Sequence, residues 1–255
     1  MLFFDELIAQ GVLSDSAIIM LVTASFFTSL LTATLGIGGG VLLLALMAGL
    51  LPVEALIPVH GLVQLGSNGN RALMTAKYID WTMLRWFSIG AVLGAVLASF
   101  IVIQLPLVFI QFAVAAFILF LVWGGKPKAQ EMKPAGRTLA GLVTTLVSMF
   151  VGATGPLVAA FVHRNNYSKM QITGTFASCM TLQHGLKAFV FTFVGFSFAQ
   201  WAGFIIIMIA SGALGTFFGL KVLKRVPAEK FMLAFKIVVT LLALRLLWQA
   251  LSSLL

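Results

Sequence analysis

Long apolar runs separated by short polar connections fill almost the whole chain. Ten runs can be distinguished, and none of them shows the two-residue alternation of a membrane β-barrel strand. Because a bilayer admits only helices and closed barrels, the pattern predicts an all-α polytopic membrane protein. The runs lie near residues 17–35, 38–51, 54–75, 83–104, 107–124, 137–151, 155–163, 169–196, 201–222 and 231–251.

The composition agrees with this prediction. Hydrophobic residues make up 61% of the 255 positions and charged residues 9%, whereas a soluble domain has about 45–50% apolar and about 25% charged residues. Several runs reach the roughly 20 residues needed to cross the hydrocarbon core. The first six residues lack the basic stretch of a cleavable signal, so we expect a multi-pass protein of the cytoplasmic (inner) membrane with no removed peptide.

The distribution of charge predicts the orientation. The net charge is +9, but the basic residues gather in connections that would share one side of the membrane, so no nucleic-acid partner is expected. Lys and Arg mark the cytoplasmic side, which places the N-terminus, the 52–54 turn and the C-terminus outside. The basic residues are Lys77, Arg85, Lys126, Lys128, Lys133, Arg137, Arg164, Lys169, Lys221, Lys224, Arg225 and Lys230, and the N-terminal acids are Asp5, Glu6 and Asp15.

This orientation predicts two inverted repeats. It is consistent only if the first two runs form a hairpin that enters from outside and the sixth and seventh form one that enters from inside. Each repeat is then a glycine-broken hairpin followed by three transmembrane helices. The predicted divisions are a first membrane repeat at 1–125, a basic cytoplasmic linker at 126–136 and a second, inverted membrane repeat at 137–255.

Motifs recur in register between the two halves. Gly36–Gly40 aligns with Gly152–Pro156 at a distance of 116 residues, and Asn68–Arg71 aligns with His184–Lys187 at the same distance without a gap. Two further matches, at a distance drifting to about 120 residues, are Trp81 with Trp201 and Pro106 with Pro227.

The glycine clusters predict binding sites at the hairpin tips. The seventh run has nine residues, about 14 Å of helix, so its hairpin is expected to turn near mid-membrane. A helix that leaves such a tip directs its N-terminal N–H groups into the interior, where they suit an anion. The alternative is that the glycines only allow close helix packing. The candidate tip residues are Gly38, Gly39, Gly40, Thr154 and Gly155.

Two cations fall inside apolar runs at equivalent positions. Arg71 and Lys187 each cost about 2.5–3.5 kcal/mol at a helix centre, and the alternative for either is snorkelling to the interface. Arg245, which has apolar neighbours, is interpreted as peripheral. All seven Asp and Glu residues lie in tails, loops or interfaces, so a substrate anion is the natural counter-charge. The same absence argues against cation transport and against a carboxylate proton relay.

Polar side chains accompany both cations. His60, Gln64 and Asn68 share a helical stripe with Arg71, and Gln183 and His184 precede Lys187. These groups can donate to oxyanion oxygens. The histidines can also titrate, or they can be neutral packing groups. Three scattered His and one Cys lack the spacing of a metal site, so no metal, cofactor or catalytic residue is expected.

At these residues the chain resembles the sulfite exporter TauE/SafE family, also called the TSUP anion permeases. The matching motifs are Gly36–Gly40, the Asn68–Arg71 segment, Ile79–Trp81 and the weaker second copy Gly152–Pro156. The family often has proline where Ala45 stands and simpler small residues where His60-Gly61 stand. The resemblance implies transport of sulfite, sulfonates, thiosulfate or similar sulfur-containing anions across the cytoplasmic membrane, and it favours export.

The expected function is therefore secondary transport of a small anion by alternating access. The hairpin tips, Arg71 and Lys187 would cradle the anion while the two halves rock around it. A passive anion channel is the closer alternative. An intramembrane enzyme built on Ser67 and the histidines is disfavoured, because no nucleophile elbow and no intramembrane carboxylate accompany them. The expected partners are the anion and the lipid bilayer, and the sequence leaves open whether protons and a second copy of the chain (a homodimer) take part.

Overall fold

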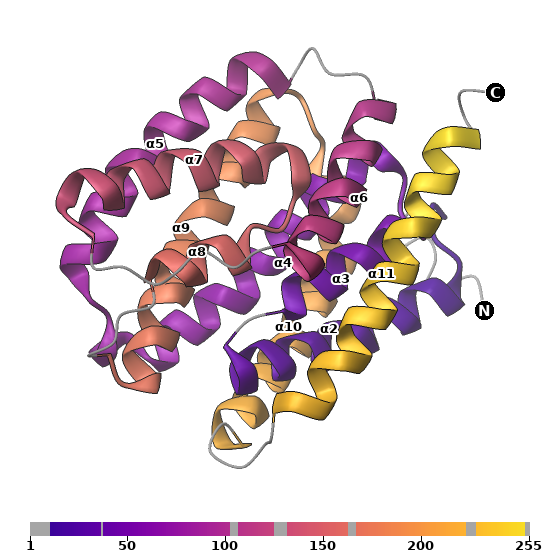
Figure 1. The fold of residues 1–255 in the computed structure, drawn as a ribbon. Helices are drawn as coiled ribbons and strands as arrows, with labels where there is room; N and C mark the ends of the chain where they lie inside the picture. The colour runs from indigo at the N-terminus through magenta and orange to yellow at the C-terminus, as the bar shows by residue number, and fades with distance from the viewer. Residues whose placement is uncertain are drawn as a thin grey trace.

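The protein is all-helical (Figure 1). The computed structural model describes residues 11–36, 38–102, 107–124, 132–162, 167–222 and 228–252. Within these ranges there are ten α-helices and the 3-10 helices η1 and η2, with no strand. The α-helices are α2 (Asp15–Leu35), α3 (Gly39–Ala48), α4 (Val53–Met74), α5 (Trp81–Val102), α6 (Leu107–Trp123), α7 (Pro134–Val151), α8 (Gly155–Val162), α9 (Lys169–Phe193), α10 (Ala202–Val222) and α11 (Ala228–Ser252); η1 is Ala76–Tyr78 and η2 is Phe198–Trp201.

Each of the ten predicted runs corresponds to one α-helix, so the all-helical part of the predicted fold class is confirmed. Local signals set several ends: the Ser14 hydroxyl caps α2, Ser168 and Gln171 form a capping box on α9, and Pro134 begins α7. Some residues used in the predictions lie outside the described residues, namely Asp5, Glu6, Pro106, Lys126, Lys128, Arg164, Lys224, Arg225 and Pro227.

Four segments of the described chain are long and apolar enough to cross a membrane. They are Asp15–Leu35, Trp81–Ile101, Pro134–Val151 and Phe198–Lys221. Helices α4 and α9 are as long, at 22 and 25 residues, but buried polar side chains lower their hydropathy. These two helices carry the buried histidine, asparagine and glutamine side chains of the described residues, together with Arg71 and Lys187.

The helices pair in a reciprocal way. Helix α2 packs along α10 and α5 along α7, while α4 packs along α9 and α6 along α11. If α2–α6 are matched in order with α7–α11, the α2–α10 pair is the counterpart of the α7–α5 pair, and the other two pairs join counterparts. The first helix of each half thus packs along the fourth helix of the other half. Two inverted repeats would produce this pairing, and the repeat itself stays a prediction.

Glycine allows the two exchanged pairs to approach closely. A Cβ atom at Gly90 of α5 would lie 1.8 Å from the Thr138 carbonyl oxygen of α7, and one at Gly215 of α10 would lie 2.1 Å from the Phe26 carbonyl oxygen of α2. In a membrane, where packing rather than water exclusion drives helix association, such contacts favour small residues.

Both hairpins join a long first arm to a short second arm. Helix α3 has ten residues and α8 has eight, about 15 and 12 Å, so neither second arm crosses the hydrocarbon core. Gly36 and Gly38 have φ angles of 86° and 105° and Gly152 has 82°, which explains glycine at these breaks. Gly39 serves packing instead, because a Cβ there would lie 1.8 Å from the Thr28 carbonyl oxygen. Within the first glycine cluster, Gly36 and Gly38 thus form the turn and Gly39 allows close packing.

Candidate functional site

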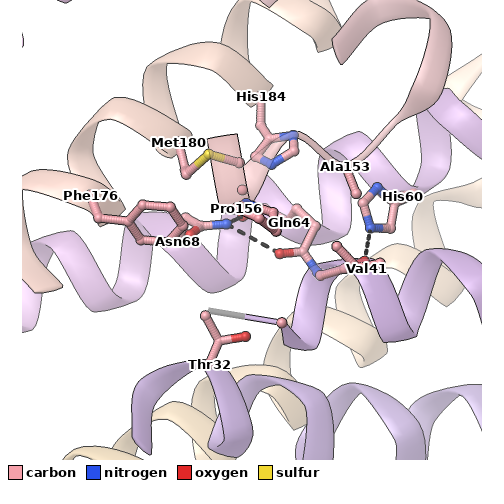
Figure 2. A pocket seen from close by; sticks show the side chains of 13 residues that line it. Thr32, Val41, His60, Gln64, Asn68, Ala153, Pro156, Phe176, Met180 and His184 are labelled. Carbon is pink, nitrogen blue, oxygen red and sulfur yellow. Dashed lines mark hydrogen bonds between the residues drawn. The ribbon is translucent and has the colours of Figure 1, made fainter. Parts of the chain in front are cut away.

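A small cavity lies where the two hairpin tips meet α4 and α9 (Figure 2). Its volume is about 20 Å³, room for about one water molecule. In this conformation the lining must therefore move apart to admit an anion. The lining residues are Thr32, Gly38, Gly40, Val41, His60, Gln64, Asn68, Ala153, Gly155, Pro156, Phe176, Met180 and His184.

The long helices line the cavity with one side chain per turn. The lining residues of α4 are His60, Gln64 and Asn68, and those of α9 are Phe176, Met180 and His184. Each member of the second set lies 116 residues after its counterpart in the first, the same distance that aligns the two glycine clusters. Gly40 and Pro156, from the two hairpin tips, are a fourth pair at this distance.

Seven of the twelve site residues proposed from the sequence line this cavity, and five lie beside or behind it. The seven are Gly38, Gly40, His60, Gln64, Asn68, Gly155 and His184; the five are Gly39, Arg71, Thr154, Gln183 and Lys187. The lining residues that were not predicted from the sequence are Thr32, Val41, Ala153, Pro156, Phe176 and Met180. The last two could have been found by advancing 116 positions from His60 and Gln64.

The polar wall on α4 is fixed by internal hydrogen bonds. His60 Nε2 lies 2.9 Å from the Gly40 carbonyl oxygen; a carbonyl only accepts, so this nitrogen carries the proton and donates. Asn68 Nδ2 donates to the Gln64 carbonyl oxygen at 2.8 Å and to Gln64 Oε1 at 3.2 Å. The Asn68 carbonyl oxygen is thereby turned toward Arg71, whose Nη2 donates to it.

Arg71 is a buried cation with unused donors. Its side chain is 1% exposed, so it does not snorkel. Its guanidinium lies 5.7 Å from the centre of the Phe176 ring, and its Nε and Nη1 atoms have no hydrogen-bond partner. Among the described residues no Asp or Glu is buried. Arg71 thus contacts two lining residues, Asn68 and Phe176, and retains hydrogen-bonding capacity for an anion.

Lys187 is also fully buried but has a partner. Its ammonium donates to the Gly152 carbonyl oxygen at 2.7 Å, at the C-terminal end of α7, where a positive charge is favourable. Its stem passes over α4, since a Cβ at Gly61 would lie 2.8 Å from Lys187 Cδ. Lys187 therefore fastens the second hairpin tip to α9 and α4 instead of facing the cavity.

Gln183 fastens the same tip from another side. Its Oε1 accepts from the Thr154 hydroxyl at 2.8 Å, and its Nε2 donates to the Thr144 and Thr145 hydroxyls at 3.1 and 3.0 Å. All four side chains are buried. This network holds the break between α7 and α8 against α9.

The two histidines meet across the halves. The ring centroids of His60 and His184 are 6.2 Å apart, with the rings at 77° to each other. The Nδ1 atoms of both rings are buried without a hydrogen-bond partner. Because His60 Nε2 carries the proton, its free Nδ1 is an acceptor in the neutral ring.

Comparison with known proteins adds one finding. A family model described as "Sulfite exporter TauE/SafE" matches residues 21–246. This range begins within α2, ends within α11 and contains both hairpins and every cavity-lining residue. No curated protein and no solved structure matches the chain.

Proposed function

The chain belongs to the sulfite exporter TauE/SafE family, and we propose that it carries small sulfur-containing anions such as sulfite, sulfonates or thiosulfate across the cytoplasmic membrane. Membership makes it a multi-pass membrane transporter of anions and not an enzyme. The resemblance noted from the glycine and Asp-Trp motifs is thereby confirmed. The anion, the mechanism and the orientation are proposals that rest on the site.

The observation that carries the proposal is Arg71 with its two unpartnered nitrogens beside the cavity. A buried charge is costly unless it is paired and hydrogen-bonded. The described part of the chain has no buried carboxylate that could pair with it. An oxyanion would supply both the charge and the acceptors. Gln64, whose amide nitrogen donates in none of the bonds described above, and the N-terminal end of α8 at Gly155 line the same space.

Transport by alternating access is supported by two features. Eight of the thirteen lining residues form four pairs 116 residues apart, so both proposed repeats contribute to the site. The cavity is also too small in this conformation to be part of an open pore. We therefore favour a carrier whose two halves, 1–125 and 137–255, rock about the bound anion over a passive channel.

The proposed direction and orientation come from the sequence. The basic linker at 126–136 and the other basic connections are placed inside, and both termini outside. With this orientation α8 enters from the cytoplasmic side and α3 from the outer side. Export is proposed because the family resemblance favours it.

The test is uptake of radiolabelled sulfite, thiosulfate and methanesulfonate into proteoliposomes, with and without a pH gradient. Saturable uptake is expected for wild type, and acceleration by the gradient would add proton coupling. Arg71→Gln should lower uptake efficiency at least about tenfold, because a hydrogen bond to a charged group contributes about 1.5–3 kcal/mol. Arg245→Gln is the matched control, since Arg245 is exposed on α11. Equal uptake by Arg71→Gln and wild type would refute the site.

Lys187→Met, measured in the same assay, distinguishes the role of Lys187 from that of Arg71. Because the Lys187 ammonium is bonded to the Gly152 carbonyl, its loss should lower the maximal rate and leave the KM for the anion within about threefold of wild type. Arg71→Gln should instead raise KM. An equal rise in KM for both variants would show that Lys187 also binds the anion.

A further inference from the structure

The two long walls of the cavity differ in polarity at equivalent positions. On α4 the three lining side chains are polar, namely His60, Gln64 and Asn68. At the positions 116 residues later, Phe176 stands for His60 and Met180 for Gln64, and only His184 is polar. Figure 2 shows Phe176 and Met180 together on the α9 side of the space.

The second hairpin extends this apolar surface. Ala153 and Pro156 line the cavity beside α9, whereas Thr32 and the Gly40 carbonyl that holds His60 belong to the first hairpin. Apart from His184 and the N-terminal end of α8 at Gly155, the polar lining groups thus lie on the α4 side. A ligand in this space meets hydrogen-bonding groups on the α4 side and an aromatic ring and a thioether on the α9 side.

This arrangement discriminates among tetrahedral sulfur anions. Sulfite, thiosulfate and alkanesulfonates share an SO3 group, and their fourth position holds a lone pair, a sulfur atom or a carbon atom. Sulfate holds a fourth oxygen there. With the SO3 oxygens toward α4, that fourth oxygen would lose its water against Phe176 and Met180 without gaining a donor, which is unfavourable. A lone pair, sulfur or carbon in the fourth position loses little hydration there, and the Met180 thioether packs well against polarizable groups.

We infer that Phe176 and Met180 are specificity-determining residues, which select anions with an SO3 group and a non-oxygen fourth position and reject sulfate. The inference rests on the proposed function, because it assumes that the anion binds in this cavity. It explains how one site could accept sulfite, thiosulfate and short sulfonates. Met180 is unbranched, so its side chain can retract by different amounts for a lone pair or a methyl group.

Met180 gives the cleaner test of the two. The Arg71 guanidinium lies 5.7 Å from the centre of the Phe176 ring, so replacement of Phe176 would also change the surroundings of this cation. Met180→Gln installs the residue found at the equivalent α4 position, Gln64, at similar length, and supplies a donor for a fourth oxygen. Met180→Leu is the matched control, because it keeps the apolar wall. Met180→Thr, which is polar and smaller, repeats the test in case the amide is not accommodated.

The experiment measures inhibition of radiolabelled sulfite uptake by unlabelled sulfate and methanesulfonate in proteoliposomes. Wild type and Met180→Leu should be inhibited by methanesulfonate and hardly by sulfate. Met180→Gln should shift the ratio of the two inhibition constants toward sulfate by about tenfold. An unchanged ratio in both polar variants, or equal inhibition by the two anions in wild type, would overturn the specificity inference alone. Absence of any sulfite, thiosulfate or methanesulfonate uptake by correctly inserted wild type would overturn the proposed function and this inference with it.

Discussion

At the residue scale, Arg71 and Lys187 occupy equivalent positions but have different neighbours. The Lys187 ammonium ends on the Gly152 carbonyl, whereas Arg71 has one amide partner and two unpartnered nitrogens. Two equivalent sites have thus been used differently: one cation holds a hairpin tip, and the other is available to a substrate. The sequence predicted both as substrate ligands, because residue type and register alone do not reveal which carbonyl a side chain reaches.

Asp80 is the residue whose contacts predict a pH dependence. Its Oδ1 accepts from the Thr82 and Met83 amides at 2.8 and 2.9 Å, and its Oδ2 accepts from the Tyr167 hydroxyl. Its backbone amide donates to Thr175 Oγ1 at 2.9 Å. Partial burial raises the pKa of Asp80, but these hydrogen bonds and the charge of Arg137 outweigh it, so the pKa lies below the ordinary value.

Asp80→Asn should therefore destabilise the protein in a pH-dependent way. Because the folded-state pKa is depressed, the carboxylate stabilises the fold above its ordinary pKa of about 4 and loses this effect as pH falls through the folded value. At neutral pH the variant should lose about 1 kcal/mol, the difference between hydrogen bonds to a charged and to a neutral acceptor. Thermal unfolding, followed by the fluorescence of the five tryptophans, measures this loss. The difference in unfolding temperature between the variant and wild type should become smaller in acid. A difference in unfolding temperature that becomes larger in acid would contradict the lowered pKa of Asp80.

Two specificity residues were missed because of their types. Phe176 and Met180 are apolar residues in an apolar helix, so composition and periodicity gave no reason to select them. Their distance of 116 residues from His60 and Gln64 is the sequence feature that indicates their place in the site. His60, Gln64, Asn68 and His184 line one cavity. They could be selected from the sequence because polar side chains in a membrane helix are costly unless they face the interior, and their role in binding stays a prediction.

At the element scale, the sequence located the ten α-helices of the described residues, since length and hydropathy suffice for segments in a bilayer. It could not predict which helices pack together, because apolar helices in lipid offer no hydrophobic face to distinguish. The information lay in small residues: Gly90 of α5 contacts the backbone of α7, and Gly215 of α10 contacts that of α2.

Gly90→Ala should separate α5 from α7. The added Cβ would lie 1.8 Å from the Thr138 carbonyl oxygen, and backbone cannot yield cheaply, so a loss of about 3 kcal/mol is expected. Gly185→Ala is the control, because its Cβ would meet only Leu65 Cδ1, at 3.8 Å. The single cysteine, Cys179, is buried, so its labelling by a thiol-reactive fluorophore during heating reports unfolding. Equal unfolding temperatures for the two variants would contradict the packing described.

At the scale of the whole molecule, two halves exchange their first and fourth helices. The α2–α10 and α5–α7 pairs, the counterpart pairs α4–α9 and α6–α11, and the paired lining positions all fit the inverted repeats inferred from the charge pattern. The sequence suggested such repeats because the placement of Lys and Arg restricts from which side each hairpin enters, and the repeats themselves stay a prediction. It could not predict the conformation, and the structure has a contracted cavity of about 20 Å³.

The orientation is testable by fusions that report the side of the membrane. A fluorescent protein that folds only in the cytoplasm should remain dark after Leu255 and should fluoresce when inserted after Lys133 in the basic linker. An alkaline phosphatase fusion should give the opposite result at each position. Fluorescence of the C-terminal fusion would place the C-terminus in the cytoplasm and contradict the proposed orientation.

The most direct test of the central claim is counterflow. Proteoliposomes loaded with unlabelled sulfite and diluted into trace radiolabelled sulfite are followed for transient accumulation of label. A carrier that alternates around one anion site predicts accumulation well above equilibrium, and this accumulation should be lost in Arg71→Gln and retained in Arg245→Gln. Uptake that only approaches equilibrium, with or without internal sulfite, would indicate a channel and contradict alternating access.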